Sequence, residues 1–167
     1  MKKFELTTNT KMFLGKKLFQ IKALINFGDV EAGELGGYIE KEENLDYDGD
    51  AWVSGDACVS GNARVSGNAC VYGDAWVSGD AWVSGNACVY GNACYTTIKG
   101  FGREYRTTTF FKCKDGKVRV QCGCFYGDLE EFRAIVKKTH GESKKAKEYL
   151  MIADLMELHF EENENDK

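Results

Sequence analysis

Residues 49–96 read GDAWVS GDACVS GNARVS GNACVY GDAWVS GDAWVS GNACVY GNACYT, eight six-residue units in a row without an insertion. Within a unit, alanine and valine alternate with a variable residue and with serine or tyrosine, which is the two-residue period of a β-strand. Glycine followed by Asp or Asn supplies a bend, because these residues accept unusual backbone angles at little cost. The pattern predicts short strands joined by corners, with alanine and valine facing inward.

A strand of four residues and a corner of two cannot build a flat sheet, and a six-residue period is typical of parallel β-helices. The phrases VSGDA and VSGNA resemble the hexapeptide pattern of left-handed parallel β-helix proteins, which is aliphatic at the first place and small at the fifth. This resemblance implies three hexapeptides in each coil and direct stacking of residues eighteen apart. We therefore expect a mainly β fold, a left-handed parallel β-helix of about three coils.

The chain divides into three segments. Leu45 and Tyr47 continue the alanine and valine phases, so we expect the β-helix to span residues 45–96. Near-identical units specify their register weakly, and open coil ends expose unpaired strand groups, so distinct ends must pin and cover the repeat. We assign residues 1–44, with a strand-like stretch at 17–25, to an N-terminal cap and residues 97–167 to a C-terminal α+β domain.

Stacking by eighteen predicts that the variable aromatic side chains point outward. Outward Trp and Tyr on neighbouring coils form a more apolar patch than a monomer usually exposes, which indicates contacts with a second copy or with another protein. The alternative is that the two end segments fold back and bury these faces. The predicted contact residues are Trp52, Tyr72, Trp76, Trp82 and Tyr90.

The sequence after residue 97 predicts a β-hairpin and two helices. A DG turn at 115–116 separates two alternating runs, with Phe111 placed opposite Val120. The side chains expected on one core face are Phe111, Cys113, Val118, Val120, Cys122 and Cys124. Zinc binding by these cysteines with His140 is the alternative, but thiols interleaved with Val and Phe favour a core, so we predict no metal.

Two helices follow the hairpin. Asp128 is expected to cap LEEFRAIVKKTH, which ends at Gly141, and Ser143 opens KKAKEYLMIADLMELHF. The apolar residues of the second helix cover more than one stripe, so we expect one side against the hairpin and a second side in a dimer. Those apolar residues are Tyr149, Leu150, Ile152, Ala153, Leu155, Met156 and Phe160. The end of the chain, EENENDK, is expected to be frayed.

Positive charge gathers after the repeat. Residues 97–149 hold thirteen Lys and Arg against seven Asp and Glu, whereas the eight hexapeptides hold one Arg against four Asp. A basic surface near Phe110 is a candidate for binding an acidic protein or nucleic acid. We favour the alternative, a solvated face of a capping domain. The residues of this basic surface are Arg103, Arg106, Lys112, Lys117 and Arg119.

Bulk composition indicates a soluble globular protein of the cytoplasm. The net charge is −4, and no apolar run reaches the length of a signal-peptide core or a membrane span. Seven cysteines without an export signal predict free thiols, although Cys70 and Cys88 stack closely enough for a disulfide. Asp56 stacks on Asp74, but two carboxylates are too few for a calcium site, and we expect solvated turns.

Catalysis is not expected. Many left-handed β-helix proteins are acyltransferases, and the resemblance makes such an enzyme the first to weigh. Those enzymes need a histidine base on the coil or on an inserted loop, but His140 and His159, both in the helical tail, are the only histidines. We therefore predict no catalytic residues and no cofactor.

The layout as a whole resembles phage and prophage proteins of unknown activity. The similarity lies in the lead-in LINFGDVEAGELGGYIEKEENL, the hexapeptide block and the tail CGCFYGDLEEFRAIVKKTHGESKKAKEYL. The resemblance implies a phage genome, a bacterial host cytoplasm and a role in countering host systems. The resulting hypothesis is a non-enzymatic binding protein, a homo-dimer or homo-trimer, that inhibits a host bacterial defence complex by contacting a host protein or nucleoprotein. The alternative is a structural, polymer-forming protein.

Overall fold

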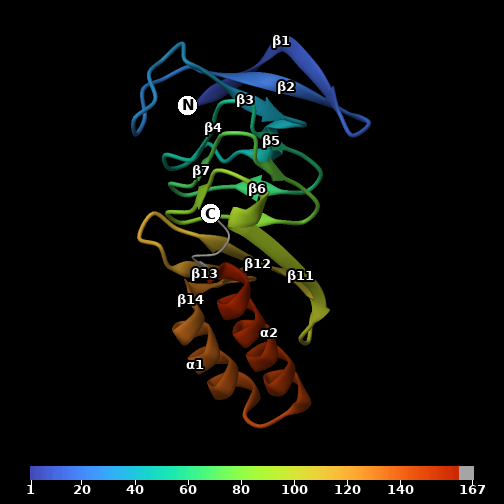
Figure 1. The fold of residues 1–167 in the computed structure, drawn as a ribbon. Coiled ribbons are helices and arrows are strands. Elements are labelled where there is room, and N and C mark those ends of the chain that lie inside the picture. The colour runs from blue at the N-terminus through green and yellow to red at the C-terminus, as the bar shows by residue number, and fades with distance from the viewer. Residues whose placement is uncertain (162–167) are drawn as a thin grey trace.

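The computed structural model describes residues 1–161, so most of the end predicted to be frayed (162–167) lies outside the described residues. The elements follow one another along one axis: N-terminal strands, the hexapeptides, an antiparallel sheet, then two helices at the far end (Figure 1). The first elements are β1 (Phe4–Phe13), β2 (Lys16–Ala23), β3 (Leu35–Ile39) and the 3-10 helix η1 (Glu42–Asn44). The hexapeptides form β4 (Trp52–Val53), β5 (Cys58–Val59), β6 (Arg64–Val65), β7 (Cys70–Val71), β8 (Trp76–Val77), β9 (Trp82–Val83) and β10 (Cys88–Val89). The last elements are η2 (Asn92–Cys94), β11 (Tyr95–Phe101), β12 (Arg106–Lys112), β13 (Val118–Cys122), β14 (Phe125–Asp128), α1 (Leu129–His140) and α2 (Lys144–Phe160).

Residues 49–96, which we call the hexapeptide stack, pair in parallel with residues eighteen positions away as far as Val89, whereas Tyr95 already pairs antiparallel with Phe111. Trp52 pairs with Cys70, and Cys70 pairs with Cys88. The same spacing joins β5 to β8 and β6 to β9. The alanines and valines from Ala51 to Val89 are at most 1% exposed, whereas Ala93 in the last unit is exposed. The predicted eighteen-residue stacking and the predicted interior are therefore confirmed.

The predicted fold class, a left-handed parallel β-helix, is wrong. The fourteen strands of residues 1–161 fall into four separate sheets, and those of the hexapeptides are only two residues long, so no continuous solenoid sheet forms. One of the sheets, β1-β2-β3-β5-β8, begins with antiparallel pairs and ends with parallel ones. The physical reason is the corner glycine: Gly55, Gly61 and Gly67 have φ of +64° to +67°, which turns the backbone out of each ladder.

The N-terminal end of the stack is closed by donors that reach its carbonyl groups. The Lys3 ammonium donates to the carbonyls of Gly49 (3.3 Å) and Ala51 (3.0 Å). The Asn44 side-chain amide donates to those of Gly61 (3.1 Å) and Ala63 (2.8 Å). Lys3 is 1% exposed and Asn44 is fully buried, so both side chains are part of the interior.

The C-terminal end is closed mainly by side chains that accept from the strands. The backbone N–H of Trp76 donates to Asn92 Oδ1 (2.7 Å), and that of Trp82 donates to Thr109 Oγ1 (2.9 Å). The Tyr95 hydroxyl donates to the Trp76 carbonyl at 2.6 Å. The last unit of the repeat, through Asn92 and Tyr95, and β12, through Thr109, thus supply the groups that a further hexapeptide would have offered.

The C-terminal part is a four-stranded antiparallel sheet, β11-β12-β13-β14, and not the single hairpin that we predicted. Its central register also differs by one residue, since Phe110 pairs with Val120 and Phe111 with Arg119. The cause is the turn: the Cys113 N–H donates to the Lys117 carbonyl, so three residues rather than two lie between the last hydrogen-bonded pair.

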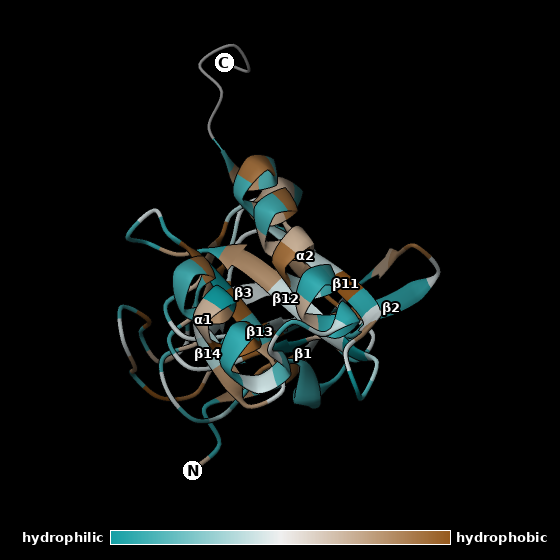
Figure 2. Ribbon diagram, turned by 90° about the horizontal axis from the view of Figure 1, so that it is seen from below, coloured by the Kyte–Doolittle hydropathy of each residue, from teal (hydrophilic) through white to brown (hydrophobic). Residues whose placement is uncertain are grey.

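This sheet joins two cores because its strands alternate their faces. Phe111 is buried in the core of the stack, whereas Phe110 and Val120 are buried against the helices. Viewed from the helical end, α1 and α2 lie over the sheet (Figure 2). The predicted helix starts are confirmed: the side chains of Asp128 and Ser143 accept N-cap hydrogen bonds, and the first helix ends at Gly141.

The N-terminal strands are more extensive than expected. The predicted strand at 17–25 is observed as β2, but the ten-residue strand β1 beside it was not predicted. Strand β1 and the loop between β2 and β3 place aromatic residues over the outer faces of the stack. Phe27 meets Trp52 edge-on at 5.4 Å, and Phe13 meets Trp76 edge-on at 5.3 Å, both measured between ring centroids.

Candidate interaction surface

The three tryptophans of the repeat are less exposed than the sequence suggested. Trp52 is 5% exposed beneath the N-terminal segment, so its outward orientation leaves it no free surface. Trp76 and Trp82 are half-buried. The Arg64 guanidinium lies 5.4 Å from the Trp82 ring centroid and covers part of it. For Trp52 and Trp76, the alternative in which an end segment covers the coil faces holds in large part, since Phe27 and Phe13 pack on them. Trp82 is covered in part by Arg64, which belongs to the repeat itself.

Each half-buried indole is held by a serine sixteen residues earlier. The indole N–H of Trp76 donates to Ser60 Oγ (3.2 Å), and that of Trp82 donates to Ser66 Oγ (2.8 Å). The residue sixteen positions before Trp52 is Gly36, which has no side chain to accept a hydrogen bond. Trp52 Nε1 accordingly has no hydrogen-bond partner within residues 1–161. A Cβ on Gly36 would lie 2.7 Å from the Trp52 ring, so the glycine leaves room for the indole.

Tyr72 and Tyr90 remain on the surface. They are 37% and 52% exposed, and their ring centroids lie 5.9 Å apart on successive levels of the stack. The Tyr72 hydroxyl lies 3.5 Å from Cys88 Sγ, and this hydrogen bond, with burial, raises the pKa of Tyr72 to about 12. Tyr72 therefore presents a neutral phenol ring at physiological pH. We call Tyr72 and Tyr90 the tyrosine pair.

The thiols beside the tyrosine pair are free. Cys70 and Cys88 are directly paired in the parallel ladder, yet all seven cysteines of the chain are unbridged. Burial raises the pKa of the Cys70 thiol. Since the thiolate is the reactive form, this residue has the character of a packing side chain rather than a nucleophile.

The five residues of the predicted basic surface do not share one face. Lys112 lies on the helix-facing side of β12 with Phe110, whereas Arg119 pairs with Phe111 on the side of the stack. The basic surface was predicted to lie near an outward-facing Phe110, but the Phe110 ring is fully buried. Arg103 and Arg106 are exposed at the turn between β11 and β12.

Two of these cations are paired with acids. Arg119 forms an ion pair with Asp115 at 2.6 Å, and Lys117 lies 3.8 Å from Asp128. The guanidinium of Arg119 is mostly enclosed, since its side chain is 20% exposed. These ion pairs are typical of local charge pairing on the surface of a capping domain. A nucleic-acid-binding surface would instead present a row of unpaired cations to the phosphates.

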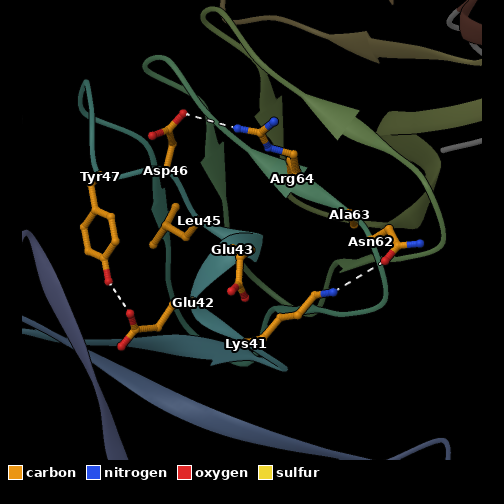
Figure 3. A pocket seen from close by; sticks show the side chains of 9 residues that line it. All are labelled: Lys41, Glu42, Glu43, Leu45, Asp46, Tyr47, Asn62, Ala63 and Arg64. Carbon is orange, nitrogen blue, oxygen red and sulfur yellow. Dashed lines mark hydrogen bonds and ion pairs between the residues drawn. The ribbon is translucent and has the colours of Figure 1, made fainter.

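A hollow of about 500 Å³ lies where η1 meets the stack (Figure 3). The Tyr47 hydroxyl donates to Glu42 at 2.7 Å, and Arg64 lies 3.8 Å from Asp46. Burial raises the pKa of Tyr47 to about 12, while the hydrogen bond from Lys2 lowers the pKa of Glu42. Cations and acids line it together, so the hollow has no dominant charge to select a ligand. Its lining residues are Lys41, Glu42, Glu43, Leu45, Asp46, Tyr47, Asn62, Ala63 and Arg64.

The residues weighed for metal binding are dispersed. Cys113 is buried, Cys122 is half-buried and Cys124 is exposed, so the three thiols do not form the single core face that we predicted. His140 stacks on Tyr149 at 6.0 Å, and His159 meets Phe160 at 4.9 Å. Within residues 1–161, no three His, Cys, Asp or Glu side chains gather as a metal site.

A second exposed apolar feature lies on α2. Met151, Leu155 and Leu158 are 71%, 53% and 64% exposed. A second apolar side of this helix, including Leu155, was predicted from the sequence, whereas Met151 and Leu158 were not among the predicted residues. Their spacing of four and three residues is the signal that could have identified them.

No protein-family model matches the chain, and no curated protein matches it. Of the helices in residues 1–161, neither is long and apolar enough to cross a membrane.

Proposed function

We propose that the chain is a non-enzymatic binding protein that acts in the bacterial cytoplasm through protein–protein contacts made by the tyrosine pair. The observation that carries this proposal is the exposure of Tyr72 and Tyr90 on the stack, while the tryptophans of the same repeat are largely covered. Tyrosine is enriched at protein interfaces because one side chain offers an apolar ring, a polar hydroxyl and few rotatable bonds.

The support beneath the tyrosine pair favours recognition by a rigid surface. The neighbouring valines, Val71 and Val89, are fully buried and paired in the parallel ladder, so the two rings stand on a packed interior. Little order has to be imposed on such a surface when a partner binds, which lowers the entropic cost of association. The free thiols beside it suit a reducing compartment.

A macromolecular partner fits this surface better than a small molecule. The two rings are exposed on the outside of the stack, whereas small molecules bind mostly in enclosed pockets. In its most concrete form, the proposal is that the partner belongs to a host defence complex and that binding inhibits it. Polymer formation by end-to-end stacking is less favoured, because Lys3, Asn44, Asn92 and Thr109 already bond to the strand ends.

Affinity capture with a matched control tests the proposal. The immobilised chain is exposed to host lysate as wild type, as Tyr72→Ser/Tyr90→Ser and as Tyr105→Ser, whose ring is 69% exposed at a distant turn. A retained protein is identified by mass spectrometry, purified and titrated. We expect wild type and Tyr105→Ser to bind it in fixed stoichiometry, and the double variant to bind at least about tenfold more weakly.

Two results would contradict the proposal. In one, the double variant binds the purified partner as tightly as wild type does. In the other, no partner is retained and the wild-type chain forms filaments as its concentration rises, which is the behaviour of a structural polymer. Circular dichroism of each variant confirms that the fold is intact before binding is compared.

A further inference from the structure

Helix α2 has two apolar sides that face in opposite directions. Its inner side is buried against α1 and the C-terminal sheet. At 100° per residue, Met151, Leu155 and Leu158 fall within about 60° of one another, and they point away from that inner side. The residues of the inner side are Ala146, Tyr149, Ile152, Ala153, Met156 and Phe160. The three outer residues, which we call the outer stripe, are thus an unpartnered apolar face on a helix that already has its core.

Charge is distributed unequally along the same helix. The first half carries Lys144, Lys145 and Lys147 against Glu148. Residues 154–161 carry Asp154, Glu157 and Glu161 and no Lys or Arg. By the same helical angles, Lys144 and Lys147 continue the outer stripe towards the N-terminus, and Asp154 flanks it towards the C-terminus. One end of the stripe is therefore positive and the other is negative.

We infer that the outer stripe is a dimerisation surface, on which α2 of one chain packs antiparallel to α2 of a second copy. A two-fold axis places the same patch on both chains, so the patch must complement itself. Antiparallel pairing meets this condition, because it sets the lysine-rich half of each helix beside the acidic half of the other. Parallel pairing would set like charges together.

The position of α2 allows such an approach. The helix lies at the far end of the molecule from β1, and its C-terminal turns show hydrophobic colour on an open side (Figures 1 and 2). Arg133 holds Asp154 at 2.9 Å and Glu157 at 2.6 Å, which fixes α2 against α1. Both carboxylates are still more than half exposed, so the ion pairs with Arg133 leave this side of the helix open to solvent.

Sedimentation equilibrium of the full chain tests the inference. We expect the wild type to be dimeric and Leu155→Glu to be monomeric, because the new charge would be buried at the two-fold axis. Met12→Glu is the matched control: Met12 is 68% exposed on β1, at the other end of the molecule, and its substitution should leave the dimer intact.

A charge swap provides a second readout that does not depend on the apolar substitution. Lys147→Glu should weaken the dimer at least about threefold, and adding Glu161→Lys should restore it, because the exchanged pair faces across the same axis. The inference is overturned if the wild type stays monomeric at the highest soluble concentration, or if the dimer persists in Leu155→Glu. It is also overturned if Lys147→Glu leaves the dimer constant unchanged.

Discussion

The two ends of the hexapeptide stack are closed by side chains of opposite hydrogen-bonding character. At the N-terminal end, Lys3 and Asn44 are donors, and each reaches two backbone carbonyls. At the C-terminal end, Asn92 and Thr109 are acceptors for backbone N–H groups. Between the ends, neighbouring levels satisfy each other with the same bonds at every repeat.

The contrast shows how a repeat obtains a defined length. A unit inside the stack needs no special side chain, since the next level supplies its partners. The first and last units lack a neighbour, and a buried polar group without a partner costs about 1–3 kcal/mol. The residues that fix the ends are therefore the ones that make these additional hydrogen bonds, and they should be more sensitive to substitution than an exposed corner residue such as Asn62.

Asn44→Ala should have the largest effect. It removes the donor to the carbonyls of Gly61 and Ala63 and the acceptor of the Lys41 N–H in a fully buried position. We expect the free energy of unfolding to fall by about 2–4 kcal/mol in urea titration. Asn62→Ala, at an exposed corner, is the control and should change it by less than about 0.5 kcal/mol. Equal losses would mean that the end is not special.

Thr109→Val probes the opposite end with a smaller change. Valine keeps the shape of threonine in a position that is 1% exposed, but the acceptor for the Trp82 N–H is lost. The expected loss of unfolding free energy is about 1–2 kcal/mol, measured in the same titration. Thr107→Val, two residues earlier on β12 and less buried, should cost less, and a larger loss there would contradict the assignment.

Glu40→Gln should have the smallest effect, and one that depends on pH. The Gly61 N–H (2.6 Å) and Lys16 (2.9 Å) donate to the Glu40 carboxylate, and the first of these contacts chiefly lowers its pKa. A lowered folded-state pKa stabilises the fold above the unfolded value of 4.5, and this contribution disappears as pH falls through the folded value. The free energy of unfolding of the wild type, measured by urea titration at each pH, should therefore exceed that of Glu40→Gln by less than about 1 kcal/mol at pH 7. The two values should be almost equal near pH 3. A gap that is constant with pH would contradict this explanation.

Local patterns in the sequence predicted local structure well. The alanine and valine interior, the eighteen-residue spacing and the caps at Asp128 and Ser143 follow from residues close together in the chain. The fold class was wrong because the turn made by each corner glycine limits a ladder to two residues, which the hexapeptide pattern does not reveal. The hairpin register was wrong because a DG turn can close with two or three residues.

Long-range contacts were the least predictable part of the candidate surface. Trp52 was expected on the surface, but Phe27, twenty-five positions earlier, packs over it. Tyr72 and Tyr90 belong to the same repeat and stay exposed. No property of a single hexapeptide distinguishes these outcomes, since they depend on where β1, β2 and the following loop cross the stack.

Hydrogen–deuterium exchange at a low and a high protein concentration tests most directly whether contacts between copies are made by α2 or by the ends of the stack. If the outer stripe pairs, amides of α2 between Lys144 and Phe160 become more protected at high concentration, while those of β1 and of residues 49–96 exchange at unchanged rates. Concentration-dependent protection confined to β1 or to the stack, with α2 unaffected, would contradict closed stack ends and dimerisation through the helix.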